Sequence, residues 1–196
     1  MKYVSPFKTS LGGHVTLREL SLHLLDILEN AVRAKATIIR VTILLDKASS
    51  MLVLRVEDDG PGMDLSAGQV LNPFYTTKKG KRTGLGLSLF QAAALQAGGE
   101  LALDRSELGG LKVEASFLYA HVDRAPLGNI GDTIKTLAVT NPETVWICQI
   151  DGPGGAHTLI LQDIMEEDPD ASLFAVTEKF GKQIDAALTE ASISVS

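Results

Sequence analysis

The stretch that decides the fold is VEDDGPGM, residues 56–63, in which an apolar run ends in two carboxylates and a glycine turn. A glycine turn lets a ligand meet the backbone directly, and Asp58 at the strand end is a candidate acceptor for the exocyclic amine of a ligand. The alternative is a plain turn. The same tetrapeptide recurs at residues 151–154, DGPG, where Ile150 stands in the place of Asp58. That copy lacks the second carboxylate, so it predicts only a hairpin turn.

Upstream of this stretch, helical spacing of apolar residues predicts an amphipathic helix over residues 16–36, with Thr16 as N-cap and Glu19 as its capping-box partner. Asp26, Asn30 and Arg33 stand at i, i+4 and i+7, so they form one polar stripe on this helix. Their oxygens suit Mg²⁺ or a water, and the guanidinium suits phosphate. A solvated helix face is the alternative. The apolar positions are Leu17, Leu20, Leu24, Leu28 and Ala31.

Downstream, residues 72–88, NPFYTTKKGKRTGLGLS, lead a basic stretch into a Gly-x-Gly turn at the start of a helix predicted over residues 84–96. Backbone N–H groups and the positive end of a helix dipole attract anions there. A basic loop alone is typical of solvated surface. Because the polar stripe, the carboxylate turn and this loop follow one another within residues 26–88, together they favour a phosphate-bearing ligand.

The order of elements predicts an α+β fold in two layers, with helices on one face of a mainly antiparallel mixed sheet. From residue 121 onward we expect a small C-terminal α+β extension of a hairpin plus helices, covering residues 121–196 and forming an interaction or dimer surface. Trp146, Phe174 and Phe180 are its predicted core. The predicted strands are residues 38–45, 51–57, 100–104, 111–117, 144–150 and 157–161, and the predicted C-terminal helices are residues 129–139 and 171–191.

Composition narrows the class of protein. A chain of 196 residues with 45% hydrophobic content sustains one substantial core. The net charge of −6 argues against a sequence-independent nucleic-acid binder. No segment has the length and apolarity of a membrane span or signal core, and the single cysteine, Cys148, forms no internal disulfide. We therefore expect a cytoplasmic protein without membrane insertion, nucleic-acid binding or protein-held zinc.

Taken in this order, the segments resemble the ATP-binding domain (GHKL type, Bergerat fold) shared by bacterial histidine kinases, gyrase, MutL and the ninety-kilodalton chaperone. The resemblance spans residues 16–117. Its carriers are residues 26–31 (DILENA) as the N box, 58–62 (DDGPG) as the G1 box, 73–78 (PFYTTK) as the F box and 83–88 (TGLGLS) as the G2 box. The F and G2 boxes and residues 97–100 (AGGE) are most similar to histidine kinases. Residues 29–31 and 34–37 also resemble the repair ATPases.

The resemblance implies an ATP-binding domain over residues 1–120, with ATP and Mg²⁺ as cofactors. It assigns Asn30 to the metal, Asp58 to the adenine amino group, Gly60 and Gly62 to the adenine pocket and Arg33 to phosphate. The residues implied to close over the triphosphate are Thr76, Thr77, Lys78, Thr83, Gly84, Leu85, Gly86 and Leu87.

Two positions depart from the family pattern. Arg82 stands where a histidine kinase usually has the first G2 glycine. Asp26 stands where kinases often carry Asn and hydrolytic relatives carry Glu, and it is the implied catalytic residue, positioning or deprotonating an attacking group. His14 and His23 lack the His-Glu context of a phosphoacceptor, so a free-standing domain is expected. His23 stands one turn before Asp26 and is taken as a surface histidine, the alternatives being a residue that supports the site or a phosphate acceptor.

The implied function is a Mg-ATP-binding histidine kinase-like ATPase, or a protein kinase acting in trans in signalling. One alternative is an ATP-dependent binding switch without efficient catalysis. Residues 123–129 (DRAPLGN) bear a weaker resemblance to small ATP-binding proteins associated with iron-only hydrogenase genes. Another alternative is an anti-sigma serine kinase. The partner would be a response regulator, a sigma-factor-like protein or an enzyme subunit, and a homodimer is a further arrangement.

Overall fold

The computed structural model describes residues 19–63 and 85–195, which form helices on a single sheet. In chain order the elements are α1 (Leu20–Arg33), β1 (Ile38–Asp46), β2 (Met51–Asp58), α2 (Leu85–Gln96), β3 (Leu101–Arg105), β4 (Leu111–Leu118), α3 (Ile130–Thr140), β5 (Val145–Gly152), β6 (Gly155–Ile160), α4 (Leu161–Glu167) and α5 (Leu173–Glu190).

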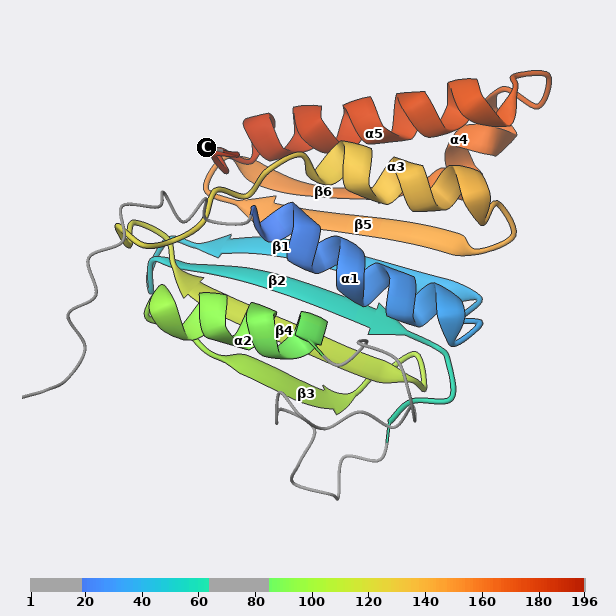
Figure 1. Ribbon diagram of the computed structural model, residues 1–196. Coiled ribbons are helices and arrows are strands. Elements are labelled where there is room, and N and C mark those ends of the chain that lie inside the picture. The colour runs from blue at the N-terminus through green and yellow to red at the C-terminus, as the bar shows by residue number, and fades with distance from the viewer. Residues whose placement is uncertain (1–18, 64–84, 196) are drawn as a thin grey trace, which may run out of the picture.

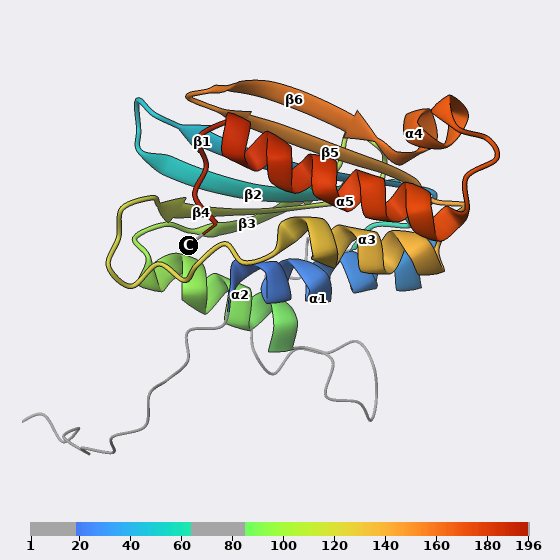
Figure 2. The ribbon, with the colours of Figure 1, turned by 90° about the horizontal axis from the view of Figure 1, so that it is seen from above.

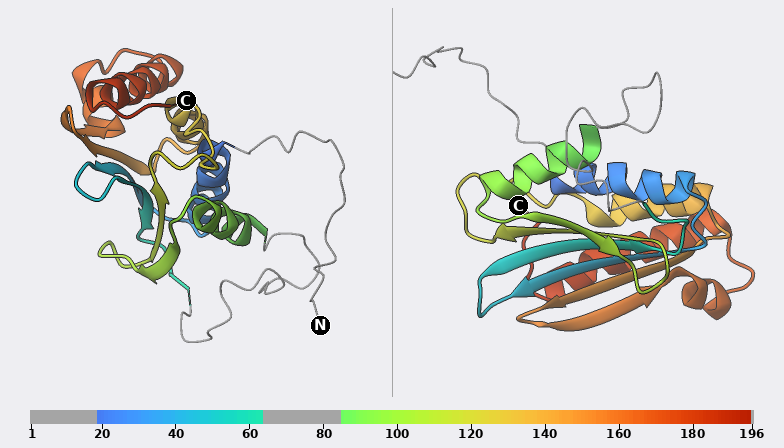
Figure 3. Two further views of the ribbon diagram at one scale, coloured as in Figure 1. Left: turned by 90° about the vertical axis from the view of Figure 1, so that its left-hand side faces the viewer. Right: turned by 90° about the horizontal axis from the view of Figure 1, so that it is seen from below.

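The sheet has six strands in the order β3-β4-β2-β1-β5-β6 (Figure 1). The β1–β5 pair is parallel and the other four pairs are antiparallel. Helices α1, α2, α3 and α5 lie on one face of this sheet (Figures 2 and 3). The prediction of an α+β fold with helices on one face of a mainly antiparallel mixed sheet is confirmed.

The core lies between the helices and the sheet face that they cover. In β1 the buried residues alternate with partly exposed ones, as a strand with one covered face requires. Val41, in the middle of β1, pairs with Val56 of β2 and with Cys148 of β5, and all three are buried. One continuous apolar cluster therefore runs from β4 to α5.

The C-terminal residues widen this same sheet. Strand β5 pairs in parallel with β1 from Ile38 to Leu44, and the β5–β6 hairpin closes where Gly152 pairs with Gly155. The hairpin turn predicted for residues 151–154 is therefore confirmed. Trp146 and Phe180 are fully buried, as predicted.

Two local predictions are wrong, and one short helix was missed. The capping box fails because α1 begins at Leu20 with Glu19 as an N-cap that makes no side-chain cap hydrogen bond. Phe174 is not core, since it is 67% exposed near the start of α5, on a different face from Phe180. Helix α4 was not predicted, because its seven residues are too short to show a helical period. Within the described ranges, no helix is both long and apolar enough to cross a bilayer.

Candidate functional site

Helix α1 presents its polar stripe away from the core. Asp26 is half-buried, while Asn30 and Arg33 are exposed, and the opposite face is buried against the sheet. Arg33 reaches back one turn to Glu29, with 3.2 Å between Nη2 and a carboxylate oxygen. Both side chains are more than two-fifths exposed, so this pair adds only a few tenths of a kcal/mol. The Nε of Arg33 also donates to the carbonyl of Glu29 at 3.1 Å, so turning the guanidinium toward an anion would break two exposed hydrogen bonds to the same residue.

The start of α2 lies directly against Asp26. A Cβ built on Gly86 would stand 3.2 Å from Cβ of Asp26 and 3.3 Å from its Oδ2. A Cβ at this distance is tighter than most real contacts, so a larger residue here would require the Asp26 side chain to shift by a few tenths of an ångström. The fold thus brings the predicted catalytic carboxylate next to a glycine of the predicted phosphate-binding turn.

The other residues predicted to close over a triphosphate are only partly described. Leu87 is half-buried and packs against the core. Thr76, Thr77, Lys78, Thr83 and Gly84 lie outside the described residues, as does the side chain of Leu85.

Asp58 ends β2 and is 7% exposed. Its Oδ1 accepts hydrogen bonds from the backbone N–H of Gly60, at 2.9 Å, and of Leu111, at 3.3 Å. For Oδ2, the described part of the chain supplies no hydrogen-bond donor. One carboxylate oxygen is thus held rigidly and the other remains able to accept.

The neighbouring carboxylate, Asp59, is fully engaged in hydrogen bonds to the start of β1. It accepts hydrogen bonds from the backbone N–H of Thr37 at 2.7 Å and of Ile38 at 2.9 Å, and from the Thr37 hydroxyl. Partial burial raises the pKa of Asp59, but these hydrogen bonds outweigh it and bring the pKa below its ordinary value. Asp59 therefore ties the glycine turn to the start of β1. Thr37 is a supporting residue that the sequence did not single out.

The glycine turn also contacts α1. A Cβ on Gly60 would lie 3.5 Å from Cβ of Ala34, which caps the C-terminal end of α1, and 3.0 Å from Oδ1 of Asp58. Gly62 has φ +71°, in the left-handed region that favours glycine. The turn after Asp58 and the start of α2 therefore both meet the helix that carries the polar stripe.

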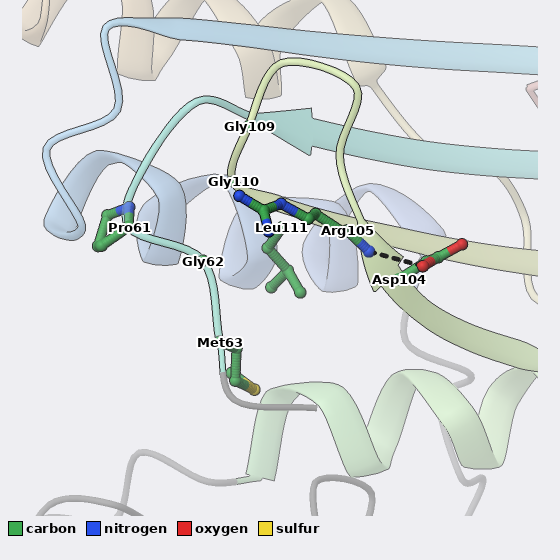
Figure 4. A pocket seen from close by; sticks show the side chains of 8 residues that line it. All are labelled: Pro61, Gly62, Met63, Asp104, Arg105, Gly109, Gly110 and Leu111. Atoms are coloured by element: carbon green, nitrogen blue, oxygen red, sulfur yellow. Dashed lines mark hydrogen bonds between the residues drawn. The ribbon is translucent and has the colours of Figure 1, made fainter. Parts of the chain in front are cut away.

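A cavity of about 250 Å³ opens beside this turn (Figure 4). The glycine turn and the β3–β4 connection both line it, and they are in contact at Gly110, which packs against Asp58. Its lining residues are Pro61, Gly62, Met63, Asp104, Arg105, Gly109, Gly110 and Leu111.

His23 is not a surface residue, so that expectation is wrong. It is 4% exposed and its ring stacks on Phe90 of α2, with 5.5 Å between centroids and 18° between planes. Helix α2 covers this side of α1, which a single helix's periodicity does not reveal. His23 therefore belongs to the packing between the two helices.

Comparison with known proteins identifies a family for this chain. Residues 16–121 match the family described as histidine kinase-, DNA gyrase B- and HSP90-like ATPase. The chain belongs to this family. It thus contains a histidine kinase-like ATPase domain.

Among curated relatives, the sensor histidine kinase CpxA of Escherichia coli K12 is 35% identical over 94 residues, covering 45% of this chain and 20% of CpxA. The sensor protein RstB of the same organism is 32% identical over 123 residues, covering 58% of this chain and 28% of RstB. The chain thus spans less than a third of these relatives.

Among solved structures, the ATP-binding domain of PrrB from Mycobacterium tuberculosis is 24% identical with a TM-score of 0.37, covering 48% of this chain and 62% of that one. The MutL ATPase domain of Aquifex aeolicus, complexed with ADP, is 17% identical with a TM-score of 0.47, covering 86% and 70%.

Proposed function

We propose that this chain binds Mg-ATP and acts as an ATPase, or as a protein kinase in trans, in signalling. The observation that carries the proposal is the meeting of the start of α2 and the glycine turn at α1, beside Asp58. Gly86 packs on Asp26, Gly60 packs on Ala34, and Asp58 keeps one carboxylate oxygen unbonded among the described residues.

The residues present fit this ligand. Mg²⁺ prefers oxygen ligands, and the exposed carboxamide of Asn30 offers one on the same helix face as Asp26. Arg33 offers a planar cation to phosphate oxygens. Oδ2 of Asp58, to which no described residue donates, suits the amino group of adenine, because a carboxylate held by backbone donors is a preorganised acceptor. Bound Mg-ATP would supply the phosphoryl group for transfer.

Asp26 is the proposed catalytic residue. It contacts Gly86 at the start of α2, whose dipole favours negative charge, and it stands one turn before Asn30, the proposed metal ligand. From there it would orient an attacking hydroxyl, imidazole or water and accept its proton. The acceptor would belong to a partner such as a response regulator, a sigma-factor-like protein or an enzyme subunit.

An ATP-dependent binding switch is the second candidate. It is favoured by the contact between Asp26 and Gly86, because α2 covers part of the carboxylate that chemistry would need. In that case nucleotide would bind without efficient turnover and would alter a partner surface instead.

Phosphate release from Mg-ATP by the purified chain separates the ATPase from the switch, whereas a kinase in trans must be assayed with its acceptor present. Turnover that falls by at least about a hundredfold in Asp26→Ala, with nucleotide affinity retained, supports catalysis. Nucleotide binding without phosphate release, in wild type and variant alike, supports the switch. Gln96→Ala is the matched control, since it removes an exposed side chain at the far end of α2.

A further inference from the structure

A segment far along the chain crosses the start of α1. We call residues 119–128, between β4 and α3, the strap (Figure 1). The backbone N–H of Leu20 donates to the carbonyl of Pro126, and that of Ser21 donates to the carbonyl of Leu127, both at 2.9 Å. The first donors of a helix have no partner inside the helix. The strap carbonyls therefore cap the N-terminal end of α1 in place of a side chain.

Gly128 fixes how closely the strap approaches. Its φ is +75°, and a Cβ there would stand 2.4 Å from Oγ of Ser21 and 2.8 Å from Cβ of Glu19. Real Cβ atoms do not come so near to other heavy atoms, so any larger residue must push the strap and α1 apart. This position is thus restricted to glycine by both backbone conformation and space.

The C-terminal tail, residues 192–195, holds the strap in turn. The N–H of Gly128 donates to the carbonyl of Val195 at 3.1 Å, and the N–H of Ser194 donates to the Tyr119 hydroxyl at 2.9 Å. Figure 2 shows the C-terminal end beside the yellow segment that precedes α3. Ile193 is buried, whereas Ser194 and Val195 are exposed. Ser194 and Val195 therefore contribute hydrogen bonds to the strap and little to the core.

Inside the strap, Arg124 stiffens the turn. Its Nε donates to the carbonyl of Tyr119 at 2.7 Å, and Nη1 donates to the carbonyl of Ala125 at 3.0 Å. The guanidinium also lies 5.1 Å from the centre of the Tyr119 ring. Tyr119, the point where the tail is attached, is thus connected to the carbonyl-bearing end of the strap.

We propose that the strap and the C-terminal tail position α1, so that the C-terminal end of the chain controls turnover at the nucleotide site. This inference rests on the proposed function. Asp26 follows Leu20 by six residues, about 9 Å along a rigid helix, so displacement of the helix start is passed to the carboxylate. Errors of about 1 Å in catalytic geometry lower rates up to about a hundredfold.

The test is a chain that ends at Ile193. It lacks both tail hydrogen bonds to the strap but keeps the buried Ile193 side chain, so we expect it to fold. Hydrogen exchange at the amides of Leu20 and Ser21 should rise about tenfold, while the amides of α5 stay unchanged. In steady-state assays kcat should fall about tenfold, with KM for ATP changing less.

Gly128→Ala tests the same contact from the strap side, and Gly155→Ala is its control. Gly155 also has positive φ, at +145°, but the nearest atom to its built Cβ is 3.9 Å away, on His157. Gly128→Ala should reproduce the loss of kcat and the faster exchange at Leu20 and Ser21. Gly155→Ala should share only the backbone strain, with turnover as in the wild type.

Two results overturn the inference alone. One is unchanged exchange at Leu20 and Ser21 in the shortened chain. The other is faster exchange there with unchanged turnover, which would leave the strap as a purely structural cap. Failure of the proposed function is recognised separately. A wild-type chain that binds no ATP in a titration contradicts the proposed function, and with it the control by the strap, before any variant is compared.

Discussion

Gly110→Ala is the sharpest test of how Asp58 is held. Gly110 sits in the β3–β4 connection, and its backbone N–H donates to the carbonyl of Asp58 at 3.0 Å. An added Cβ would stand 2.2 Å from Oδ1 of Asp58, 2.6 Å from its carbonyl oxygen and 2.7 Å from the amide nitrogen of Gly60. Two of these atoms are backbone, so relief requires the glycine turn to move by about 1 Å.

The expected magnitude follows from two terms. Overpacking of this kind costs about 1–3 kcal/mol. Displacement of the turn also weakens the hydrogen bonds that Asp58 receives from Gly60 and Leu111, each with a net contribution of about 1 kcal/mol. Urea denaturation should therefore show a loss of about 3 kcal/mol in the free energy of unfolding. ATP affinity, measured by calorimetry, should fall at least about tenfold, equivalent to 1.4 kcal/mol.

Gly109→Ala is the matched control in the same turn. Its φ is +113°, but a Cβ there would have no atom within 4 Å. It should cost about 1–2 kcal/mol of backbone strain and leave ATP affinity within about twofold. A Gly110→Ala protein as stable as the wild type and equal to it in affinity would refute the packing described around Asp58.

Three further predictions concern residues outside the ligand contacts. Asp59→Asn should cost about 1 kcal/mol at neutral pH, since Asp59 is partly exposed. Because the folded-state pKa of Asp59 is lowered, its stabilisation is present above the unfolded pKa of about 4 and is lost as pH falls, so urea curves of variant and wild type should converge in acid. Burial raises the pKa of the Cys148 thiol to about 12, so iodoacetamide at pH 8 should label it only after unfolding, and rapid labelling of the folded chain would contradict its placement. Phe180→Ala should cost about 3–5 kcal/mol and Phe174→Ala less than about 0.5 kcal/mol in thermal or urea unfolding, and equal costs would contradict their different burial.

Local patterns predicted much of the fold. Apolar runs bounded by turn residues predicted the strands of the six-stranded sheet, and helical spacing of apolar residues predicted α1 and α5. The contrast between Asp58 and Ile150 also separated the two DGPG turns, and the second turn proved to be the β5–β6 connection.

What the sequence did not reveal depends on contacts between distant segments. The local pattern predicts Thr16 as the N-cap of α1. The backbone N–H groups of Leu20 and Ser21 instead donate to carbonyls about a hundred residues later, which no local capping rule anticipates. His23 is buried only because α2 returns to cover it.

At the candidate site too, local spacing predicted some features, and contacts between distant segments determine the others. The polar stripe on α1 followed from helical spacing alone. Helical spacing could not predict that Asp58 and Asp59 make different hydrogen bonds. Thr37 and Ile38, which donate to Asp59, precede it by more than twenty residues. The approach of Gly86 to Asp26 likewise appears only when α2 packs on α1.

The most direct test of the account is calorimetric titration of the wild-type chain with ATP, with and without Mg²⁺, beside Asn30→Ala and Asp58→Asn. We expect Mg²⁺ to tighten binding to the wild type, Asn30→Ala to abolish that effect while retaining metal-free ATP binding, and Asp58→Asn to weaken ATP about tenfold under both conditions. No heat of binding to the wild type, or wild-type affinity and metal dependence in both variants, would contradict a nucleotide site between α1 and the glycine turn.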